Sequence, residues 1–452
     1  MMGRGESGQE QFFYAFKLED YVPEEHLLRG IDQVLDLSEL HAHLAPYYSH
    51  TGRPSIDPEL MIRMLIIGYC FGIRSERRLC EAVQLNLAYR WFCRLSIEDK
   101  VPDHSTFSKN RHGRFRESDT LRYVFGRVLC RGIEEGLVGG KGFAVDASIV
   151  KADASRFHHH DEDDDDWGGG HTRAVREYLA GLDEAEPRMS KSTKTVSSTD
   201  PSASWTAATG DRAFYAYSTH YLIDLKTGIV VDVKASAVNK AAEVAVTQAM
   251  LERVEQTFDL KPTRLVGDTN YGSAAMLGWL VEDKGIEPHV PVWDKSKRSD
   301  GTFSRSDFVF DAEHDEYHCP GDKRLRTSGH VDYDDTIRYR ASKRDCDRCA
   351  LKPRCCPNTA VRKLSRSIHD SARDVARHMG TTLEYEQSQK QRKKVEVLFA
   401  HMKRVLNLTR LRLRGLTGAN DEFILTATAQ NLRRMAKYLG TGPPTNCVSA
   451  VT

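Results

Sequence analysis

Three acidic side chains stand at positions where a carboxylate can do chemistry. Glu396 lies in an amphipathic stretch, with Arg392 four residues before it and Lys403 seven residues after it. Residues at these separations share one face of an α-helix. Asp146 and Asp268 each end a short apolar run, the pattern of a buried strand. An acid at the carboxyl end of a strand is held rigidly at the edge of the sheet where ligands collect.

Each of these acids also has a purely structural interpretation. The helical glutamate can be a surface ion-pair partner, and each aspartate can cap a helix or form a turn. Folding alone does not require three converging carboxylates, however, because they repel one another. We therefore treat Asp146, Asp268 and Glu396 as one candidate site.

The same residues carry a resemblance to a known family. The chain resembles bacterial insertion-sequence transposases of the DDE type, in the broad group that includes the IS4, IS5 and IS1182 families, and it looks most like the IS1182 members. The resemblance covers almost the whole chain. Asp146, Asp268 and Glu396 fall where this family has its three catalytic acids, and Arg392 and Lys403 match the spacing of its C-terminal signature.

Two positions depart from the family pattern. Gln389 stands where the signature has a tyrosine, with Tyr385 one helical turn earlier, and this leaves the role of the missing tyrosine open. Asn270 stands before Tyr271, where many members have glycine. Asparagine tolerates a left-handed backbone better than most residues, so the second change is mild. Neither departure replaces a catalytic acid.

The chemistry explains why three carboxylates are needed. Two divalent ions about 3.5–4 Å apart can activate the attacking oxygen and stabilise the leaving oxygen of a phosphodiester. Mg²⁺, or Mn²⁺ in its place, prefers oxygen ligands and keeps several waters. Asp146 would bridge the two ions, and Asp268 and Glu396 would each complete one metal site. Arg392 and Lys403 would hold the phosphates of the cut strand, unless they form only a solvated basic face.

Secondary-structure patterns predict an α/β chain. Strands are expected at 215–224 and 228–233, joined by a turn at 225–228, followed by a helix at 241–258 and a strand near 288–292. The resemblance implies that this mixed sheet is a ribonuclease H-like catalytic core, with an all-α N-terminal domain and a cysteine-rich insertion. The expected domains are 1–139 (helical, for DNA binding or dimerisation), 140–294 (first part of the core, with a flexible excursion at 151–210), 295–378 (cysteine-rich insertion), 379–440 (second part of the core) and 441–452 (tail).

The N-terminal region reads as short helices separated by tight turns. Helices are predicted at 60–71, after the start signal Asp57-Pro58-Glu59, and at 75–85. A third, basic helix opens near 102, which suggests a DNA reader of the helix-turn-helix kind. The candidate DNA contacts on this helix are Lys109, Arg111 and Arg114. The alternative is a dimerisation domain with a charged exterior.

Charge is unevenly distributed along the chain. At 452 residues and 40% hydrophobic content the protein should form two or three globular domains, and its net charge of +1 does not indicate a nucleic-acid partner. The segment 390–414, however, is rich in lysine and arginine and contains Glu396 as its one acid. Local basic density is what contacts phosphates. The candidate DNA contacts in this segment are Arg392, Lys393, Lys403 and Arg404.

A cysteine group follows the second aspartate. Cys346 and Cys349 form a CxxC pair, and Cys319 and Cys355 can complete a tetrahedral thiolate site for Zn²⁺. The ligand spacing is uneven, so Cys356 or His318 can substitute, and unligated reduced thiols are the alternative. IS1182-like transposases have a similar cysteine-rich insert.

The resulting hypothesis is a DNA transposase. The resemblance implies that two protomers, or a higher oligomer, bind the terminal inverted repeats, cut with Mg²⁺ and join the freed 3′-hydroxyl to double-stranded target DNA. The alternatives are a nuclease on the same core that does not join strands, and a DNA-binding descendant without activity. No targeting or membrane-spanning segment is visible, so we expect a bacterial cytoplasmic, nucleoid-associated protein without a membrane partner.

Overall fold

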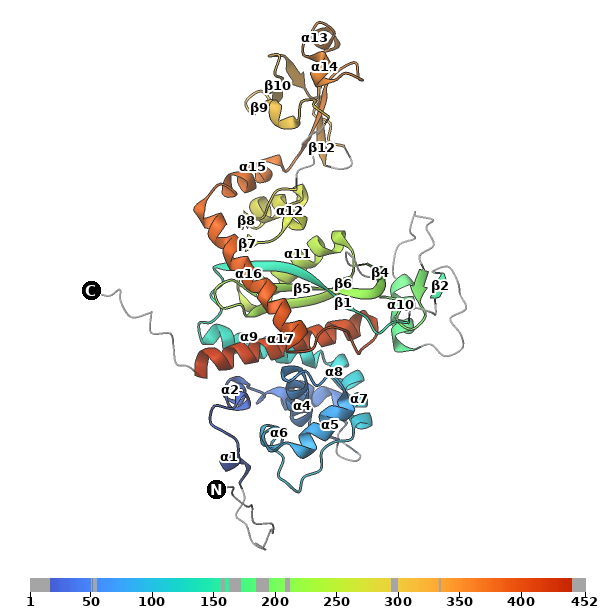
Figure 1. Cartoon of the computed structure of the whole chain (residues 1–452), viewed down its shortest axis with the longest axis vertical. Helices are drawn as coiled ribbons and strands as arrows, with labels where there is room; N and C mark the ends of the chain where they lie inside the picture. Colours follow the sequence, from blue (N-terminus) through green and yellow to red (C-terminus); the bar gives the residue numbers. More distant parts are fainter. Residues whose placement is uncertain are drawn as a thin grey trace, which may run out of the picture.

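A mixed β-sheet forms the middle of the elongated molecule in the computed structural model (Figure 1). The structure describes residues 17–49, 51, 55–155, 159–161, 172–183, 195–207, 212–293, 300–332 and 335–440. The strands of this sheet are β1 (Gly142–Lys151), β4 (Ser204–Thr206), β5 (Phe214–Asp224), β6 (Val230–Ala237), β7 (Arg264–Val266) and β8 (Glu287–His289). Helices cover both faces, which confirms the predicted α/β class.

Strand β1 is central to the sheet and has neighbours of both directions. It pairs antiparallel with β5 along its whole length and parallel with β7 at its beginning. β7 in turn pairs parallel with β8, and β6 and β4 lie on the far side of β5. The predicted hairpin between β5 and β6 is confirmed. Its turn contains Gly228 at a φ of 71°, a left-handed conformation that favours glycine.

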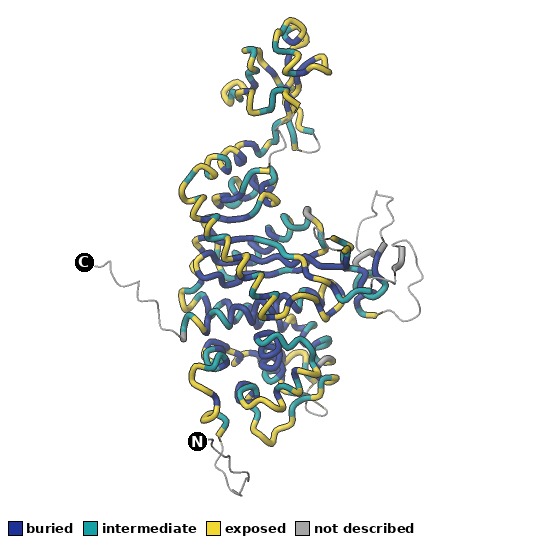
Figure 2. Tube along the Cα trace, viewed as in Figure 1, coloured by how far each residue is buried: buried dark blue, intermediate teal, exposed yellow. Residues whose placement is uncertain are grey.

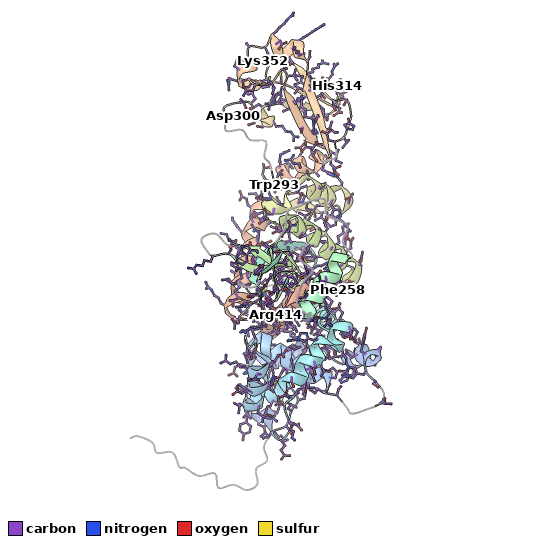
Figure 3. The ribbon with its side chains drawn as sticks, turned by 90° about the vertical axis from the view of Figure 1, so that its right-hand side faces the viewer. Phe258, Trp293, Asp300, His314, Lys352 and Arg414 are labelled. Atoms are coloured by element: carbon purple, nitrogen blue, oxygen red, sulfur yellow. The ribbon has the colours of Figure 1, made fainter. Side chains whose placement is uncertain are left out.

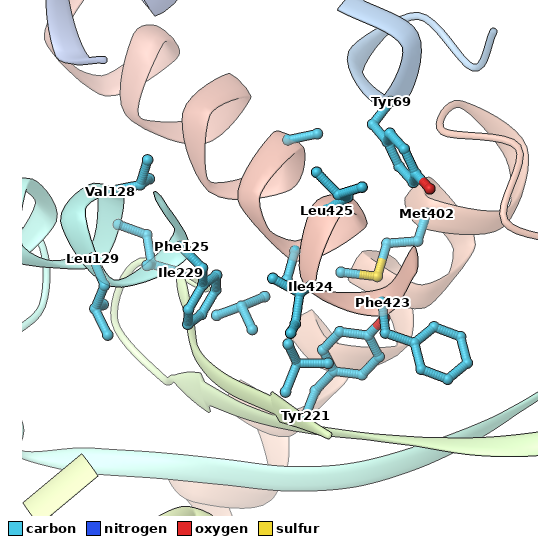
Figure 4. Packing of buried hydrophobic residues seen from close by; sticks show 14 of the residues in the cluster. Tyr69, Phe125, Val128, Leu129, Tyr221, Ile229, Met402, Phe423, Ile424 and Leu425 are labelled. Atoms are coloured by element: carbon cyan, nitrogen blue, oxygen red, sulfur yellow. The ribbon is translucent and has the colours of Figure 1, made fainter. Parts of the chain in front are cut away.

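The two faces of the sheet are covered by different helices. α11 (Lys240–Phe258), predicted at 241–258, packs on β5 and β6, while α9 (Thr120–Glu134) and α17 (Gly415–Gly440) lie on the other side (Figure 1). Figure 4 shows Phe125 of α9, Ile424 of α17 and Ile229 packed together next to Tyr221 of the sheet. All four are buried in one hydrophobic cluster.

The N-terminal helices join the same cluster through α17, which contacts α2 and α4. Asp57 caps α4 by accepting a hydrogen bond from the Glu59 amide at 2.9 Å, with Pro58 as the first helical residue, as predicted. The predicted helices at 60–71 and 75–85 and the one opening near 102 are confirmed as α4, α5 and α7. The helices of this region are α1 (Leu18–Tyr21), α2 (Leu27–Val34), α3 (Leu40–Leu44), η1 (Ala45–Tyr47), α4 (Pro58–Cys70), α5 (Glu76–Leu85), α6 (Leu87–Phe92), α7 (His104–His112) and α8 (Arg114–Glu117).

The segment expected as an excursion between strands contains ordered elements among its described residues. These are β2 (His159–Asp161), α10 (Arg173–Asp183), β3 (Thr195–Ser197) and β4. Asp200 is fully buried there and accepts hydrogen bonds from the Tyr217 hydroxyl at 2.5 Å and from the Gly415 amide at 3.1 Å. This carboxylate therefore ties the segment to the start of α17. The acidic run at 162–166 lies outside the described residues.

The cysteine-rich insertion has a hydrophobic core of its own at one end of the molecule (Figures 1 and 2). Its elements are η4 (Arg305–Asp307), β9 (Val309–Asp311), β10 (Glu316–His318), β11 (Arg324–Arg326), β12 (Thr336–Ala341), α13 (Lys343–Asp347), α14 (Lys352–Cys355) and β13 (Lys363–Ser367). Figure 3 shows His314 and Lys352 on this insertion, at the opposite end of the core from Arg414.

The chain returns from the insertion to the sheet through two helices. α15 (Asp370–Met379) packs on α12 (Ala274–Gly278) and on β8, and α16 (Leu383–Arg404) then crosses β8, β7 and β1. The short helices η2 (Thr269–Tyr271) and η3 (Trp279–Asp283) complete the stretch between β7 and β8. None of the helices in the described ranges is long and apolar enough to cross a lipid bilayer.

Candidate active site

Asp146 lies in the middle of β1, not at its end as the sequence suggested. The strand continues to Lys151 because β5 pairs with it throughout. On the other edge, pairing with β7 stops at Ala144 opposite Val266. Asp146 therefore follows the point where the β7 edge of β1 opens, which gives it the accessibility of a strand end. Its side chain keeps 16% of its surface exposed.

Asp268 follows the end of β7 by two residues, as predicted. Its Oδ1 accepts a hydrogen bond from the Asn270 amide at 2.8 Å and caps the short helix η2, so its structural role is present as well. Gly267 before it is required for packing: a Cβ there would lie 2.9 Å from the ring of Tyr271. Asn270 does not have the positive φ for which we considered it suited.

The two aspartates lie close enough to influence each other electrostatically. Burial raises the pKa of Asp146 above its ordinary value, and the negative charge of Asp268 raises it further. The Ala147 amide, 2.8 Å from Oδ1, and the Arg392 guanidinium act in the opposite direction. A bound cation would stabilise the ionised form of a carboxylate, such as Asp146, whose pKa is raised in this way.

Helix α16 places Arg392 directly beside this pair. Its Nη2 lies 3.4 Å from Oδ2 of Asp146. Its Nε is buried and has no hydrogen-bond partner in the described part of the chain. The guanidinium thus occupies the space next to the carboxylate and retains an unused donor.

Glu396 lies between two residues of α16 that contact the same rung of the sheet. Arg392, one turn before it, approaches Asp146, and Phe399, one turn after it, packs on Tyr221 with 5.5 Å between ring centroids. Asp146 and Tyr221 are paired across β1 and β5. Residues at these spacings share a helix face, so Glu396 lies on the side of α16 that carries Arg392 and Phe399, and its side chain is exposed.

The start of α16 is fixed on β8 by the residues at the altered tyrosine position. The side-chain amide of Gln389 donates a hydrogen bond to the backbone carbonyl of His289 at 3.2 Å. The ring of Tyr385 stacks on the His289 ring, with 6.0 Å between the ring centroids. Gln389 lies seven residues, about two turns, before Glu396. Its contact therefore fixes the helix that presents the glutamate.

The basic residues of α16 and the segment after it differ in accessibility. Lys393 and Arg404 are exposed, whereas Lys403 is half-buried, and burial lowers its pKa from the ordinary value. Arg410 and Arg414 both pair with Asp153, at 2.9 and 3.0 Å. The basic segment is thus partly neutralised by an acid from beyond the end of β1, which the local charge count did not include.

The candidate DNA contacts of the predicted basic helix lie on two helices, with Lys109 and Arg111 on α7 and Arg114 at the start of α8, and they differ from one another. Lys109 is exposed, and the guanidinium of Arg114 stacks over the Tyr48 ring at 4.3 Å. Arg111 is buried and forms an ion pair with Glu76, so we no longer include it among the DNA contacts.

The cysteines predicted to bind zinc line one cavity of about 20 Å³, together with Cys356. Burial, followed by the neighbouring Cys356, raises the pKa of the Cys355 thiol to about 12. His318 lies on the face of β10 opposite to Tyr317, 3.6 Å from Glu316 and 3.8 Å from Asp311. This position excludes His318 as a ligand alongside the cysteines. The residues around the cavity fit a cation that binds thiolates. The thiols predicted as ligands are Cys319, Cys346, Cys349 and Cys355.

One acid near the site was missed by the sequence analysis. Glu243, in the first turn of α11, accepts a hydrogen bond from the Asn270 side chain at 3.4 Å. With Asp146 and Asp268 it raises the pKa of the buried Tyr271 well above its ordinary value, after burial as the largest cause. Its place near Asp268 depends on how α11 packs on η2, for which the sequence gives no signal.

Two family models match the chain. One described as a transposase domain (DUF772) matches residues 16–113, and one described as a transposase DDE domain matches residues 318–436. The second match contains Glu396, whereas Asp146 and Asp268 lie between the two matched segments. No solved structure matches the chain.

These matches define the class of protein. The chain is an enzyme that cuts DNA strands and joins them, and its family uses divalent metal ions. The two matches together support an insertion-sequence DDE transposase, and their combination fits the IS1182 family.

Proposed function

We propose that Asp146, Asp268 and Glu396 are the catalytic acids of this transposase and hold two Mg²⁺ or Mn²⁺ ions. The observation that carries the proposal is the position of Glu396 between Arg392 and Phe399, whose contacts converge on the strand rung of Asp146. Asp146 would bridge the ions, and each of the other two acids would complete one metal site. Bound ions supply Lewis-acid stabilisation of the attacking and leaving oxygens.

The neighbouring residues would position the DNA. Arg392 has an unused buried donor beside Asp146, which suits a phosphate oxygen of the strand to be cut. Two groups of residues would contact the phosphates of double-stranded DNA. On α16 they are the exposed Lys393 and Arg404 and the half-buried Lys403, and on the N-terminal helices they are Lys109 and Arg114.

The proposal also includes the fold of the core, the binding of the DNA ends and a metal in the insertion. β1, β4 and β6 pair antiparallel with β5, and β7 and β8 run parallel to β1. This sheet, with helices on both faces, supports a ribonuclease H-like core. The helices of 1–139 would bind the terminal inverted repeats, and a homodimer or higher oligomer would pair the two ends. The five thiols around one cavity support a structural Zn²⁺ in the insertion of 295–378.

Cleavage of DNA that carries the element's own terminal repeats tests this proposal. The wild type should nick at the repeat boundary with Mg²⁺ and then produce strand-transfer products, whereas Glu396→Gln should bind the DNA without cutting it. Glu386→Gln is the matched control, because Glu386 is an exposed acid on the same helix. Cleavage without joined products would indicate a nuclease instead, and undiminished cleavage by Glu396→Gln would overturn the assignment.

A further inference from the structure

The five-stranded sheet of the insertion has two different faces. Tyr317, Leu325, Tyr339 and Leu364 point into its hydrophobic cluster. Because side chains alternate along a strand, the residues between them lie on the outer face. The cations of this outer face are Arg324 and Arg326 on β11, Arg338 and Arg340 on β12, and Lys363 on β13, and all of them are exposed.

Three of these cations lie side by side. Arg326 pairs with Arg340, and Arg340 pairs with Lys363, in the register of three neighbouring strands. Strands in a sheet are about 4.8 Å apart, so the row spans about 10 Å. Like charges directly opposite each other destabilise a sheet. Folding of the insertion therefore gives no reason for this row.

The acids of this face neutralise only part of the charge. Glu316 approaches both Arg324 and Arg326 at 3.2 Å, and Asp332 approaches Arg338 at 2.6 Å. Arg340 and Lys363 have neither an ion pair nor a hydrogen-bonded side-chain partner anywhere in the described ranges. Their side chains are free to bind an anion.

A hollow adjoins these two unpaired cations. It has a volume of about 410 Å³, and Arg340 and Lys363 line it together with Asn358 and Thr359. The side-chain amide of Asn358 can donate hydrogen bonds, whereas the Thr359 hydroxyl already donates to the Val361 carbonyl at 3.1 Å. The hollow thus offers a neutral donor beside the row of charges, and the acid in its lining, Asp300, accepts hydrogen bonds from Thr302.

We infer that this outer face, centred on Arg340 and Lys363, is a second DNA-binding surface that contacts the phosphate backbone of duplex DNA outside the catalytic centre. The inference rests on the proposed function for the presence of DNA. The occupant follows from charge complementarity, because a regular array of phosphates offers several anions to several in-register cations. Contacts of this kind bind the backbone without reading sequence.

Salt-dependent binding of the full-length protein to a labelled duplex of arbitrary sequence tests the inference. Each lost phosphate contact lowers the slope of log K against log salt by about 0.9, so Arg340→Gln with Lys363→Gln should lower it by roughly 1.8. The matched control is Lys141→Gln with Lys261→Gln, which removes two exposed charges just before the first residues of β1 and β7, outside the insertion. The control should keep the wild-type slope, and so should Arg340→Lys.

Four results would overturn the inference. An unchanged slope in the double variant would do so, as would an equal fall in the control. So would loss of binding to phosphatidylserine vesicles with DNA binding intact, which would indicate a membrane surface. Failure of the wild type to bind any duplex would instead contradict the proposed function itself. The fourth result is a lowered melting temperature of the double variant, which would assign the two cations a structural role, because removing opposed like charges should not destabilise the sheet.

Discussion

Nη2 of Arg392 lies 3.4 Å from Oδ2 of Asp146, although 246 residues separate them in the chain. The contact joins the last long segment of the core to its first strand. It places a cation beside a carboxylate whose pKa burial has raised. The same guanidinium has a buried Nε without a partner among the described residues. If the carboxylates hold metal ions as we propose, Arg392 would be able to bind a phosphate in place of Asp146.

Replacement of Arg392 by glutamine should slow strand cleavage by roughly 30-fold, because a charge-assisted hydrogen bond of about 2 kcal/mol is lost. Single-turnover cleavage with saturating protein measures this effect apart from binding. Lys390→Gln removes an exposed charge from the same helix and is the control. Equal losses in the two variants would show that only the charge of the helix matters.

Asp200 should make stability depend on pH. Burial raises its pKa to about 6 from an ordinary value of 3.8. The folded state therefore holds this proton more tightly than the unfolded state, and stability falls as pH rises from about 4 to 6. The shift corresponds to about 3 kcal/mol at most.

The variant Asp200→Asn keeps an oxygen that can accept from Tyr217 and Gly415 but has no charge to bury. Its free energy of unfolding, measured in urea at several pH values, should increase relative to the wild type between pH 4 and 6. Parallel profiles of the two proteins would contradict the assigned pKa.

Gly272 is required for the approach of the chain that follows β8 to the Asp268 turn. A Cβ at this position would lie 1.9 Å from the carbonyl oxygen of Pro291. Gly272→Ala should therefore lower the free energy of unfolding by about 3 kcal/mol, since backbone must shift. Gly139→Ala is the control, because its Cβ meets nothing within 4 Å. A neutral Gly272→Ala in thermal unfolding would show that this turn is less tightly packed.

The insertion should bind about one Zn²⁺ per chain, held by four thiolates. Metal analysis of the purified protein should detect the ion, and Cys346→Ser should lose it. Cys130→Ser, which replaces a half-buried cysteine on α9, should retain the ion. A wild type without zinc, in which the thiols of the insertion react freely with a thiol reagent after unfolding, would favour unligated cysteines.

The elements that the sequence predicted well are those with local signals. The β5–β6 hairpin follows from Gly228 in its turn, and α4 follows from Asp57 and Pro58 at its start. The prediction that a strand ends at Asp146 was wrong. β1 continues past this residue because it pairs with β5, a partner about 70 residues away. Its apolar run ends where pairing with β7 ends, which explains why the pattern still located the carboxylate.

Contacts between distant segments could not be predicted. Asp153 neutralises Arg410 and Arg414 only because β1 ends beside the segment before α17. The role of Gln389 depends on the carbonyl of His289 in a strand 100 residues earlier. Side-chain type and spacing indicated which residues are chemically able to form the site, whereas packing of α16 on the sheet determines which of them meet.

Counting bound metal ions tests the central claim most directly. Electron paramagnetic resonance of Mn²⁺ with the protein on DNA that carries its terminal repeats should give about two ions for the wild type and for Glu386→Gln. Asp146→Asn, Asp268→Asn and Glu396→Gln should each lose at least one ion while the DNA stays bound. The same number of ions in all five proteins would contradict the assignment of these three acids as the metal-binding centre.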